Sequence, residues 1–325
     1  MAHSVKTHRG SFAAIAFLCL GLSACHSARQ PVIAVIPETT AQELWESEHA
    51  GAEQAAHRYG FSVYWNGPSR EDDLSRQIQL VHRMVARNVA GLILSPDHSV
   101  ALISPVREAL AEGIPTVVVG SPLGIDPGGK LSYIVNDDNA TGRLVAERLA
   151  SRLKAGDTVA ILGVDPAILS LVARAKAIQS SLQVAVPGLQ IVQRHITSFG
   201  FDEAEQTAED VIRRTPHLRA IVALNISQIR AADFALQDNP MRQKVILLGC
   251  DQDLDLVRLV RTGGMDALIA QDTFTMGFEA VETIARLRKG ETVPIRRTIA
   301  PVLITRENVD QPAIQKVLDM DWSAH

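Results

Sequence analysis

Short, mostly apolar runs alternate with longer amphipathic stretches from position 31 onward. The runs cover 32–36, 61–65, 91–95, 116–120 and 132–135, and then 158–163, 190–196, 220–225, 245–251 and 267–272. Continuous runs of this length, rich in Val and Ile, are typical of strands that are buried on both faces of a parallel sheet. We therefore predict a strand at each run.

The stretches between these runs have helical periodicity. Within 73–88, Leu74, Ile78, Val81 and Val85 recur at a spacing that places them on one helical face. Similar patterns occupy 140–153, 202–214 and 275–290. Strands that alternate with helices predict an α/β protein with right-handed crossover connections.

The same order of strand, polar loop, helix and strand occurs in both halves of the chain. A chain of 325 residues is long enough for two domains of ordinary size. We therefore expect two doubly wound domains with parallel sheets, and not one large sheet. Ligands of such folds lie beyond the carboxyl ends of the strands, so the residues that follow each apolar run are the candidates for a binding site.

The N-terminus has the pattern of an export signal. A short basic region precedes an apolar segment over 11–24, which is too short to span a bilayer comfortably and ends at Cys25. The stretch "LSAC" (22–25) resembles the bacterial lipobox. The resemblance implies a signal peptide over 1–24 and a lipid on Cys25; the alternative is an ordinary cleavable signal that happens to contain a cysteine.

A lipid on Cys25 would attach the chain to a membrane in the cell envelope, on the periplasmic or extracellular side. Two or three acyl chains anchor a protein stably, where one chain does not. The rest of the chain is expected to be soluble.

Composition narrows the classes of function. The net charge is −4 and no arm rich in Lys and Arg is present, which argues against a nucleic-acid partner. Outside the N-terminal segment, Cys250 is the only cysteine, and no Cys/His spacing suggests a metal site. Neither a nucleophile elbow nor a phosphate-binding glycine loop is found, so we expect neither an enzyme nor a cofactor.

Several segments match one family in order. They are "YWNGP", "EDDLSRQIQLVHRMVARNVAGLILSP", "EGIPTVVVG", "VNDDNATGRLVAERLA", "VALN", "LLGCD" and "ALIAQDTFTMGFEAVETI". Together, from about 32 to 310, they resemble the type I periplasmic binding proteins of the ribose-binding, LacI-related group. That family's transcription factors carry an N-terminal DNA-binding module, whereas this chain has an export signal in its place, which argues against a repressor.

The resemblance implies two α/β lobes joined by three crossings at a hinge, near Asp138, Gln271 and Ala300. The expected lobes are 31–137 plus 272–299 and 138–271 plus 300–325. A small ligand, most simply a monosaccharide or polyol, would bind between them and close them. The expected partner is the membrane permease of an ABC importer. The alternative is a sensory receptor of the same fold that signals to a membrane kinase or chemoreceptor, and the sequence does not separate the two.

Family position nominates the ligand-binding residues. Carboxylates and carboxamides satisfy sugar hydroxyls, and an aromatic ring covers the apolar face of the sugar. The candidates are Gln42, Trp45, Asp138, Arg174, Asn225, Asp251 and Gln271, with Glu38 and Asn139 as weaker ones.

Each main candidate also has a purely structural explanation. Asp251 is placed to cap the helix that follows it, and Asn225 to form a turn. Gln271 is placed to bond hinge backbone, Trp45 to pack a helix onto the sheet, and Arg174 to lie on a solvated helix face.

The chain also departs from the sugar-binding pattern. Sugar binders of this group usually have an Asp-Arg pair where this chain has Gly120 and Ser121, and the family's Asn-Asp becomes Asn225 and Ile226. The loss of a carboxylate and a guanidinium predicts a ligand that is less polar, larger or differently charged than ribose.

Overall fold

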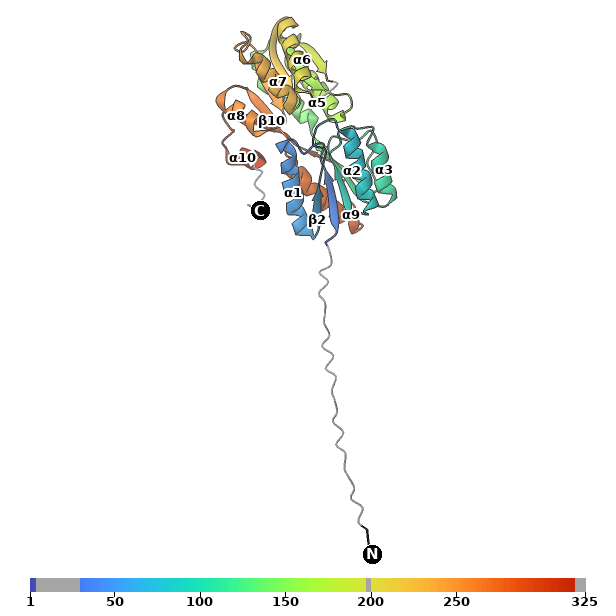
Figure 1. The fold of residues 1–325 in the computed structure, drawn as a ribbon. Helices are drawn as coiled ribbons and strands as arrows, with labels where there is room; N and C mark the ends of the chain where they lie inside the picture. Colours follow the sequence, from blue (N-terminus) through green and yellow to red (C-terminus); the bar gives the residue numbers. More distant parts are fainter. Residues whose placement is uncertain (4–29, 197–199, 319–325) are drawn as a thin grey trace.

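The computed structural model describes residues 1–3, 30–196 and 200–318 as two α/β lobes stacked end to end (Figure 1). Cys25 and the expected signal peptide, apart from its first three residues, lie outside the described residues. Within the described ranges, no helix has the length and apolar character needed to cross a membrane.

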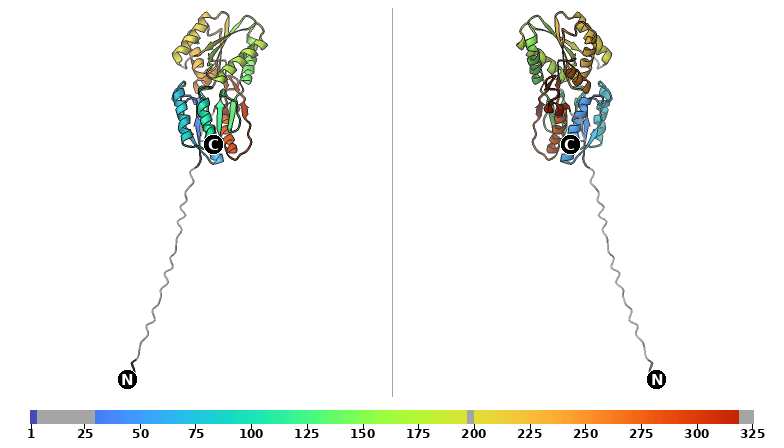
Figure 2. Two further views of the ribbon diagram at one scale, coloured as in Figure 1. Left: turned by 90° about the vertical axis from the view of Figure 1, so that its right-hand side faces the viewer. Right: turned by 90° about the vertical axis from the view of Figure 1, so that its left-hand side faces the viewer.

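The N-terminal lobe is built on a six-stranded parallel sheet with the order β11-β5-β4-β3-β1-β2. The strands are β1 (Val32–Ile36), β2 (Ser62–Trp65), β3 (Gly91–Leu94), β4 (Thr116–Gly120), β5 (Leu131–Asn136) and β11 (Arg296–Ile299). Helices cover both faces of the sheet, as the two views in Figure 2 show. One face holds α1 (Glu43–Tyr59) and α9 (Thr273–Arg288), and the other holds α2 (Leu74–Ala86) and α3 (Ile103–Ala111).

The C-terminal lobe repeats this plan with the strand order β12-β10-β9-β8-β6-β7. The strands are β6 (Thr158–Val164), β7 (Gln190–His195), β8 (Leu218–Ala223), β9 (Ile246–Cys250), β10 (Ala267–Ala270) and β12 (Val302–Thr305). All pairs are parallel except β12, which is antiparallel to β10. The parallel sheets expected from the sequence are therefore present, with the antiparallel edge strand β12 as an addition that was not predicted.

Helices also cover both faces of the C-terminal sheet. The first face holds α4 (Asp138–Leu149), the short 3-10 helix η1 (Ala150–Arg152) and α5 (Leu169–Ala185). The second holds α6 (Phe201–Arg214), α7 (Ile226–Gln237), α8 (Leu254–Thr262) and α10 (Pro312–Leu318).

Strand β1 shows why the apolar runs are continuous. Ile33 and Val35 point into the core beneath α1 and α9, while Ala34 and Ile36 point into the core beneath α2 and α3. Successive side chains of a strand face opposite sides of its sheet, so a strand with helices on both sides has no position left for a polar residue.

Helices α1 and α9 pack with their backbones in close approach, which requires glycine on both. A methyl group at Gly51 would overlap the Phe274 carbonyl oxygen, and one at Gly277 would overlap the Glu48 carbonyl oxygen. This approach ties the start of α9 to the helix that follows β1. Both helices begin beside the cleft described below, so their fixed packing holds one wall of it in place.

Within the described residues, the chain passes from one sheet to the other between β5 and α4, between β10 and α9, and between β11 and β12. These passages fall at 137–138, 271–272 and 300–301. We propose that the lobes divide there, into 31–137 plus 272–299 and 138–271 plus 300–325. Strands β11 and β12, which flank the last passage, were not among the predicted strands.

Candidate ligand-binding cleft between the lobes

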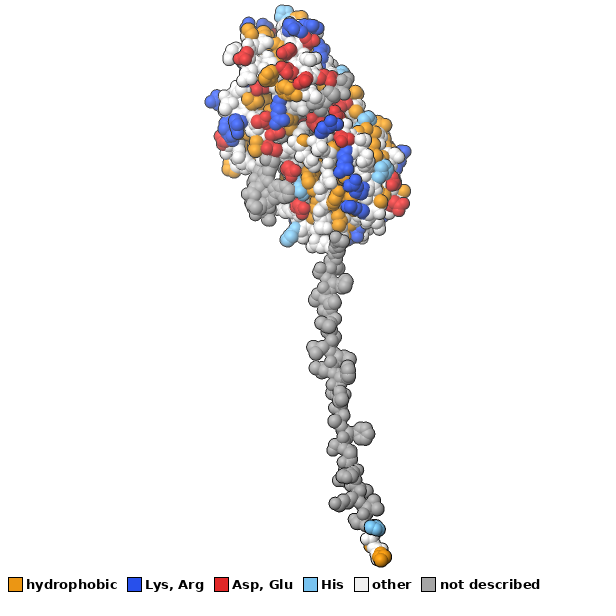
Figure 3. Space-filling view, in the orientation of Figure 1, with side chains coloured by type: hydrophobic (Ala, Val, Ile, Leu, Met, Phe, Trp, Pro, Cys, Tyr) orange, Lys and Arg blue, Asp and Glu red, His pale blue; other side chains and the backbone are white. Residues whose placement is uncertain are grey.

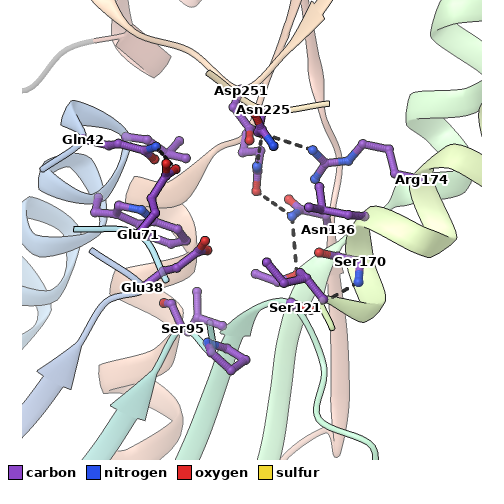
Figure 4. A pocket seen from close by; sticks show the side chains of 18 residues that line it. Glu38, Gln42, Glu71, Ser95, Ser121, Asn136, Ser170, Arg174, Asn225 and Asp251 are labelled. Carbon is purple, nitrogen blue, oxygen red and sulfur yellow. Dashed lines mark hydrogen bonds and ion pairs between the residues drawn. The ribbon is translucent and has the colours of Figure 1, made fainter. Parts of the chain in front are cut away.

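A cavity of about 510 Å³, part of it open to solvent, lies between the two lobes (Figure 4). Loops at the carboxyl ends of strands in both sheets line it, as the topology predicts. The N-terminal lobe contributes Glu38, Gln42, Leu44, Trp45, Glu71, Ser95, Pro96, Val119, Gly120, Ser121 and Asn136. The C-terminal lobe contributes Ile168, Ser170, Leu171, Arg174, Asn225, Asp251 and Gln271.

The cleft brings together most of the residues nominated from the sequence. Gln42, Trp45, Arg174, Asn225, Asp251 and Gln271 all line it, and so does the weaker candidate Glu38. Asp138 is not among the lining residues, and Asn139 is exposed. Instead, the Asp138 Oδ1 atom accepts a hydrogen bond of 3.1 Å from Arg174 Nε, so Asp138 positions the arginine.

Arg174 is buried in the cleft wall and does not lie on a solvated helix face. Its side chain is 3% exposed. Nη1 donates to Asp251 Oδ1 and to the Leu224 carbonyl oxygen, both at 3.2 Å. Burial alone would lower the pKa of Arg174, but the Asp251 and Asp138 carboxylates outweigh it and raise that pKa. The guanidinium therefore stays charged and fixed in orientation.

A chain of side-chain hydrogen bonds links the two lobes through Asp251. Gln271 Nε2 donates to Asp251 Oδ1, and Asn136 Nδ2 donates to Gln271 Oε1 at 2.5 Å. Asp251 has a φ of +77°, a left-handed conformation that non-glycine residues rarely adopt. Such backbone strain is often found where a side chain must be held in one direction at a functional site.

Two buried N–H groups in the cleft wall have no hydrogen-bond partner among the described residues. Asn225 caps α7, with Oδ1 accepting from the Gln228 N–H at 3.0 Å, but its Nδ2 is unpaired. Trp45 Nε1 is also unpaired. Buried donors are nearly always satisfied in folded proteins, so both atoms point to a missing acceptor. Both residues line the cleft.

The opposite wall is acidic. Gln42 Nε2 donates to Glu71 Oε1, and Ser227 Oγ of the other lobe donates to Glu71 Oε2 at 3.2 Å. Burial raises the pKa of Glu71 to about 7, against the lowering effect of these two hydrogen bonds. The pKa of Glu38 is raised well above its usual value, first by burial and then by neighbouring carboxyls, beginning with Asp97.

Gly120 and Ser121, which replace the usual Asp-Arg pair, have a structural role in the closed cleft. Gly120 has a φ of +73°, and a Cβ atom at this position would lie 3.8 Å from the indole ring of Trp45. Ser121 Oγ accepts a hydrogen bond of 3.2 Å from the Ser170 N–H of the other lobe. Gly120 therefore suits a backbone conformation that favours glycine, and Ser121 joins the lobes.

Further hydrogen bonds hold the lobes together around the cleft. The Ser99 N–H donates to the Ala167 carbonyl oxygen at 2.8 Å, and the Leu169 N–H donates to Ser99 Oγ at 3.0 Å. Elsewhere, Glu43 Oε2 on α1 accepts a bond of 3.1 Å from the Leu254 N–H at the start of α8. The structure is thus a closed arrangement of the two lobes.

The sequence analysis did not nominate some of the lining residues, although two of them stand at the ends of strands, where it expected ligand-binding residues. Ser95 comes directly after β3 and Asn136 ends β5, which are the positions expected to face a ligand. Glu71 gave no such signal, because it lies in the loop between β2 and α2, several residues beyond the strand. In the part of the chain that the structure describes, no group of three or more acidic, His or Cys side chains is arranged to hold a metal ion.

The fold and the cleft can be set against known proteins. A family model described as a periplasmic binding protein domain matches residues 33–292, which is most of the chain. The chain belongs to the periplasmic binding protein family. The family and the two-lobe fold expected from the sequence are thereby confirmed.

Curated relatives of this periplasmic binding protein span nearly its whole length. It is 29% identical over 283 residues to the D-ribose/D-allose-binding protein of Pseudomonas aeruginosa, in an alignment that covers 84% of this chain and 88% of that protein. It is 26% identical over 269 residues to the D-allose-binding periplasmic protein of Escherichia coli, covering 81% and 86% of the two chains.

A solved structure shares the architecture of this periplasmic binding protein. The carbohydrate transporter solute binding protein from Agrobacterium radiobacter, crystallised in complex with D-arabinose, is 25% identical and superimposes with a TM-score of 0.81. The match covers 89% of this chain and 99% of that one. Its extent shows that both lobes, and not only one, follow the family's plan.

Both lobes also carry charged side chains of both signs. On the face drawn in Figure 3, Lys and Arg side chains are interspersed with Asp and Glu. The concentration of acidic groups in the cleft of this periplasmic binding protein therefore differs from the mixed charge on that face.

Proposed function

We propose that this protein is the substrate-binding component of an ABC-type importer and that it binds a sugar-like small molecule between its lobes. The observation that carries the proposal is the composition of the cleft. Carboxylate, carboxamide and guanidinium groups from both lobes converge on it, with Trp45 beside them. This combination suits a ring that has hydroxyls on its edge and apolar hydrogens on its face.

The contacts indicate how each group would act. Arg174 and Asn225 present donors, Asp251 and Glu38 present acceptors, and the Trp45 ring offers an apolar surface. Because these groups belong to different lobes, a ligand satisfies them together only when the lobes are closed. Ligand binding therefore favours the closed arrangement, in a hinge motion about the three passages between the sheets.

The relatives support the ligand class and the location. Those reported above are named for D-ribose and D-allose, and the solved structure holds D-arabinose. We extend to this chain the class of ligand, a small sugar or related polyol, and the role of delivering it to a membrane permease. The protein would act on the periplasmic or extracellular side of a membrane.

We further propose that the mature chain is a lipoprotein anchored through Cys25. The support is the order of basic region, apolar segment and "LSAC" at the N-terminus. Cells that express Cys25→Ser should accumulate an unprocessed, unlipidated precursor. Radiolabelled palmitate entering the variant as it enters the wild type would rule out this anchor.

A thermal-shift screen of the full-length protein against sugars, polyols, nucleosides and amino acids tests the ligand class. A ligand at a hundred times its dissociation constant stabilises the folded state by about 2.7 kcal/mol, which gives a readily measured shift. We expect hits among sugars or polyols. A folded protein that no sugar or polyol stabilises, or that only amino acids or nucleosides stabilise, would contradict the proposed ligand class.

A further inference from the structure

Acidic groups outnumber basic ones in the cleft wall. Glu38, Glu71 and Asp251 line it, whereas Arg174 is the only cationic side chain among the described lining residues. Asp97 lies close enough to Glu38 to raise the pKa of that carboxyl. An empty cleft of this composition carries an excess of negative charge when its carboxyls are ionised.

Arg174 does not balance the charge of the acidic wall on the opposite side of the cavity (Figure 4), because it is already paired with two carboxylates, Asp138 and Asp251. Nε bonds to Asp138, and Nη1 bonds to Asp251 and to the Leu224 carbonyl oxygen. Two carboxylates thus surround one guanidinium. The glutamates on the opposite side of the cavity are left without a cation of the chain's own.

Glu38 is the carboxyl without a partner. Both oxygens of Glu71 accept hydrogen bonds, from Gln42 and Ser227, while no described residue donates one to Glu38. Figure 4 shows the Glu38 carboxyl pointing into the cavity from the side opposite Arg174. A carboxylate removed from bulk water is unfavourable unless a cation or hydrogen-bond donors compensate it.

Other parts of the cleft wall contain hydrogen-bond donors that have no acceptor among the described residues. Asn225 is 5% exposed and Trp45 is 6% exposed, and each holds an N–H without an acceptor. A ligand that satisfies this cleft must therefore offer acceptors to these two donors and a positively charged donor to Glu38. Hydroxyl groups alone meet the first need, but they leave an ionised Glu38 without a cation, whereas an ammonium group stabilises its ionised form.

We propose that the ligand of this cleft carries a positively charged amino group together with its hydroxyls, as an amino sugar or amino polyol does. The ammonium group would lie against Glu38, with Glu71 beside it, and the hydroxyls would face Asn225 and the Arg174–Asp251 pair. This inference rests on the proposed function and narrows its ligand class.

A change in the protonation of the cleft carboxyls is a second way to detect an amine ligand. In the empty cleft, burial raises the pKa values of both Glu38 and Glu71, and nearby carboxyls, including Asp97 and Asp251, raise them further. An ammonium group favours the ionised carboxyls and so lowers these pKa values. Binding of an amine at neutral pH should therefore release protons from the protein, whereas binding of a neutral sugar should not.

The test is isothermal titration calorimetry on the full-length protein with matched ligands. Each set contains a neutral hexose, its 2-amino form and its N-acetylated amine: D-glucose, D-glucosamine and N-acetyl-D-glucosamine, and the same three for galactose. The inference predicts that, in at least one set, the amine binds ten times more tightly or better than both uncharged forms. Titrations in two buffers of different ionisation enthalpy should show proton release for the amine alone.

A variant tests whether the preference for amines over neutral sugars depends on the Glu38 side chain. Glu38→Gln keeps the size and hydrogen-bonding ability of the side chain but removes its charge, so the ratio of amine to neutral affinity should fall about tenfold. Glu112→Gln makes the same change at the exposed end of α3, outside the cleft, and should leave the ratio as in the wild type.

The outcomes separate this inference from the function on which it rests. Neutral sugars that bind as tightly as their amines, or a ratio that Glu38→Gln does not lower, would overturn the amine and leave a sugar-binding protein. If the folded protein bound neither these compounds nor any other sugar or polyol of the thermal-shift screen, the proposed function would fail together with the inference. Tight binding of the amines that Glu38→Gln weakens selectively would support both.

Discussion

Arg174 Nη1 lies 3.2 Å from Asp251 Oδ1, in an ion pair in the cleft wall that joins α5 to the residue after β9. Both side chains are almost fully buried. The pair is held from two sides, by Asp138 on the arginine and by Gln271 on the aspartate. Loss of either charge would leave the other buried without full compensation, which is strongly unfavourable.

Asp251→Asn is therefore expected to weaken ligand binding. The amide removes the acceptor charge that orients Arg174 and faces the ligand hydroxyls, and hydrogen bonds to charged groups contribute roughly 1.5–3 kcal/mol. Calorimetry with the best ligand of the thermal-shift screen measures the change. Asp238→Asn, an exposed residue that ends α7, is the matched control. Equal affinities of Asp251→Asn and wild type would remove Asp251 from the site.

Ser99→Ala is expected to lower affinity without touching the cleft wall. Its hydroxyl accepts the Leu169 N–H of the other lobe, so the substitution removes a bond that exists only when the lobes are closed. Such a bond contributes about 0.5–1.5 kcal/mol, which corresponds to a loss of roughly two-fold to tenfold in affinity. Ser75→Ala, whose hydroxyl bonds to Asp73 within one lobe, should bind as the wild type does. If both variants bound equally well, closure at Ser99 would not contribute to affinity.

Glu48 should make stability depend on pH. Its side chain is fully buried, and among the described residues only the Ser95 hydroxyl donates to it. Burial raises its pKa to about 8 against the lowering effect of that bond. Because the pKa in the unfolded chain is near 4.5, the folded state holds a proton that the unfolded state lacks between these values. The free energy of unfolding therefore falls as pH rises through this window.

Glu48→Gln removes this proton, so its stability should fall less than that of the wild type between pH 5 and pH 8. One full proton corresponds to about 1.4 kcal/mol per pH unit. Urea unfolding at several pH values measures the difference, with the exposed Glu112→Gln as the matched control. Parallel curves for the wild type and Glu48→Gln would show that Glu48 is ionised in the folded protein.

Gly277→Ala should destabilise the N-terminal lobe although alanine favours helices. The added methyl group would overlap the Glu48 carbonyl oxygen on α1, and a backbone atom does not move aside as a side chain does. Overpacking of this kind costs typically 1–3 kcal/mol. Thr283→Ala on the same helix should change the free energy of unfolding by less than about 0.5 kcal/mol. A similar small effect at Gly277 would show that α1 and α9 separate easily.

The pattern of apolar runs in the sequence was enough to predict most of the strands, and so most of the fold. Buried strands such as β1 stand out because helices on both faces leave no polar position in them. Strands β11 and β12 did not stand out. β11 begins with the exposed, charged Arg296 and Arg297, and it lies at the edge of its sheet, where one apolar residue, Ile299, is buried. Strand β11 therefore has no continuous apolar run to detect, and β12 is an edge strand of only four residues.

The lining residues could be predicted from the sequence where the strand topology alone places a side chain at the cleft. Asn225, Asp251 and Gln271 follow β8, β9 and β10, and all three meet at one edge of the C-terminal sheet. Position in the chain did not reveal the roles of residues whose placement depends on tertiary packing. Asp138 lies two residues after the lining residue Asn136 and bonds to Arg174 instead. Glu71 reaches the cavity from the loop between β2 and α2, whose path no local pattern determines.

A crystal structure of the protein grown with the sugar or amino sugar that gives the largest thermal shift tests the central claim most directly. The account predicts one ligand molecule between the lobes, with its ring against Trp45, its hydroxyls at Asn225 and the Arg174–Asp251 pair, and the lobes closed around it. A ligand bound elsewhere on the protein, or an empty cleft in crystals that contain a saturating concentration of that compound, would contradict it.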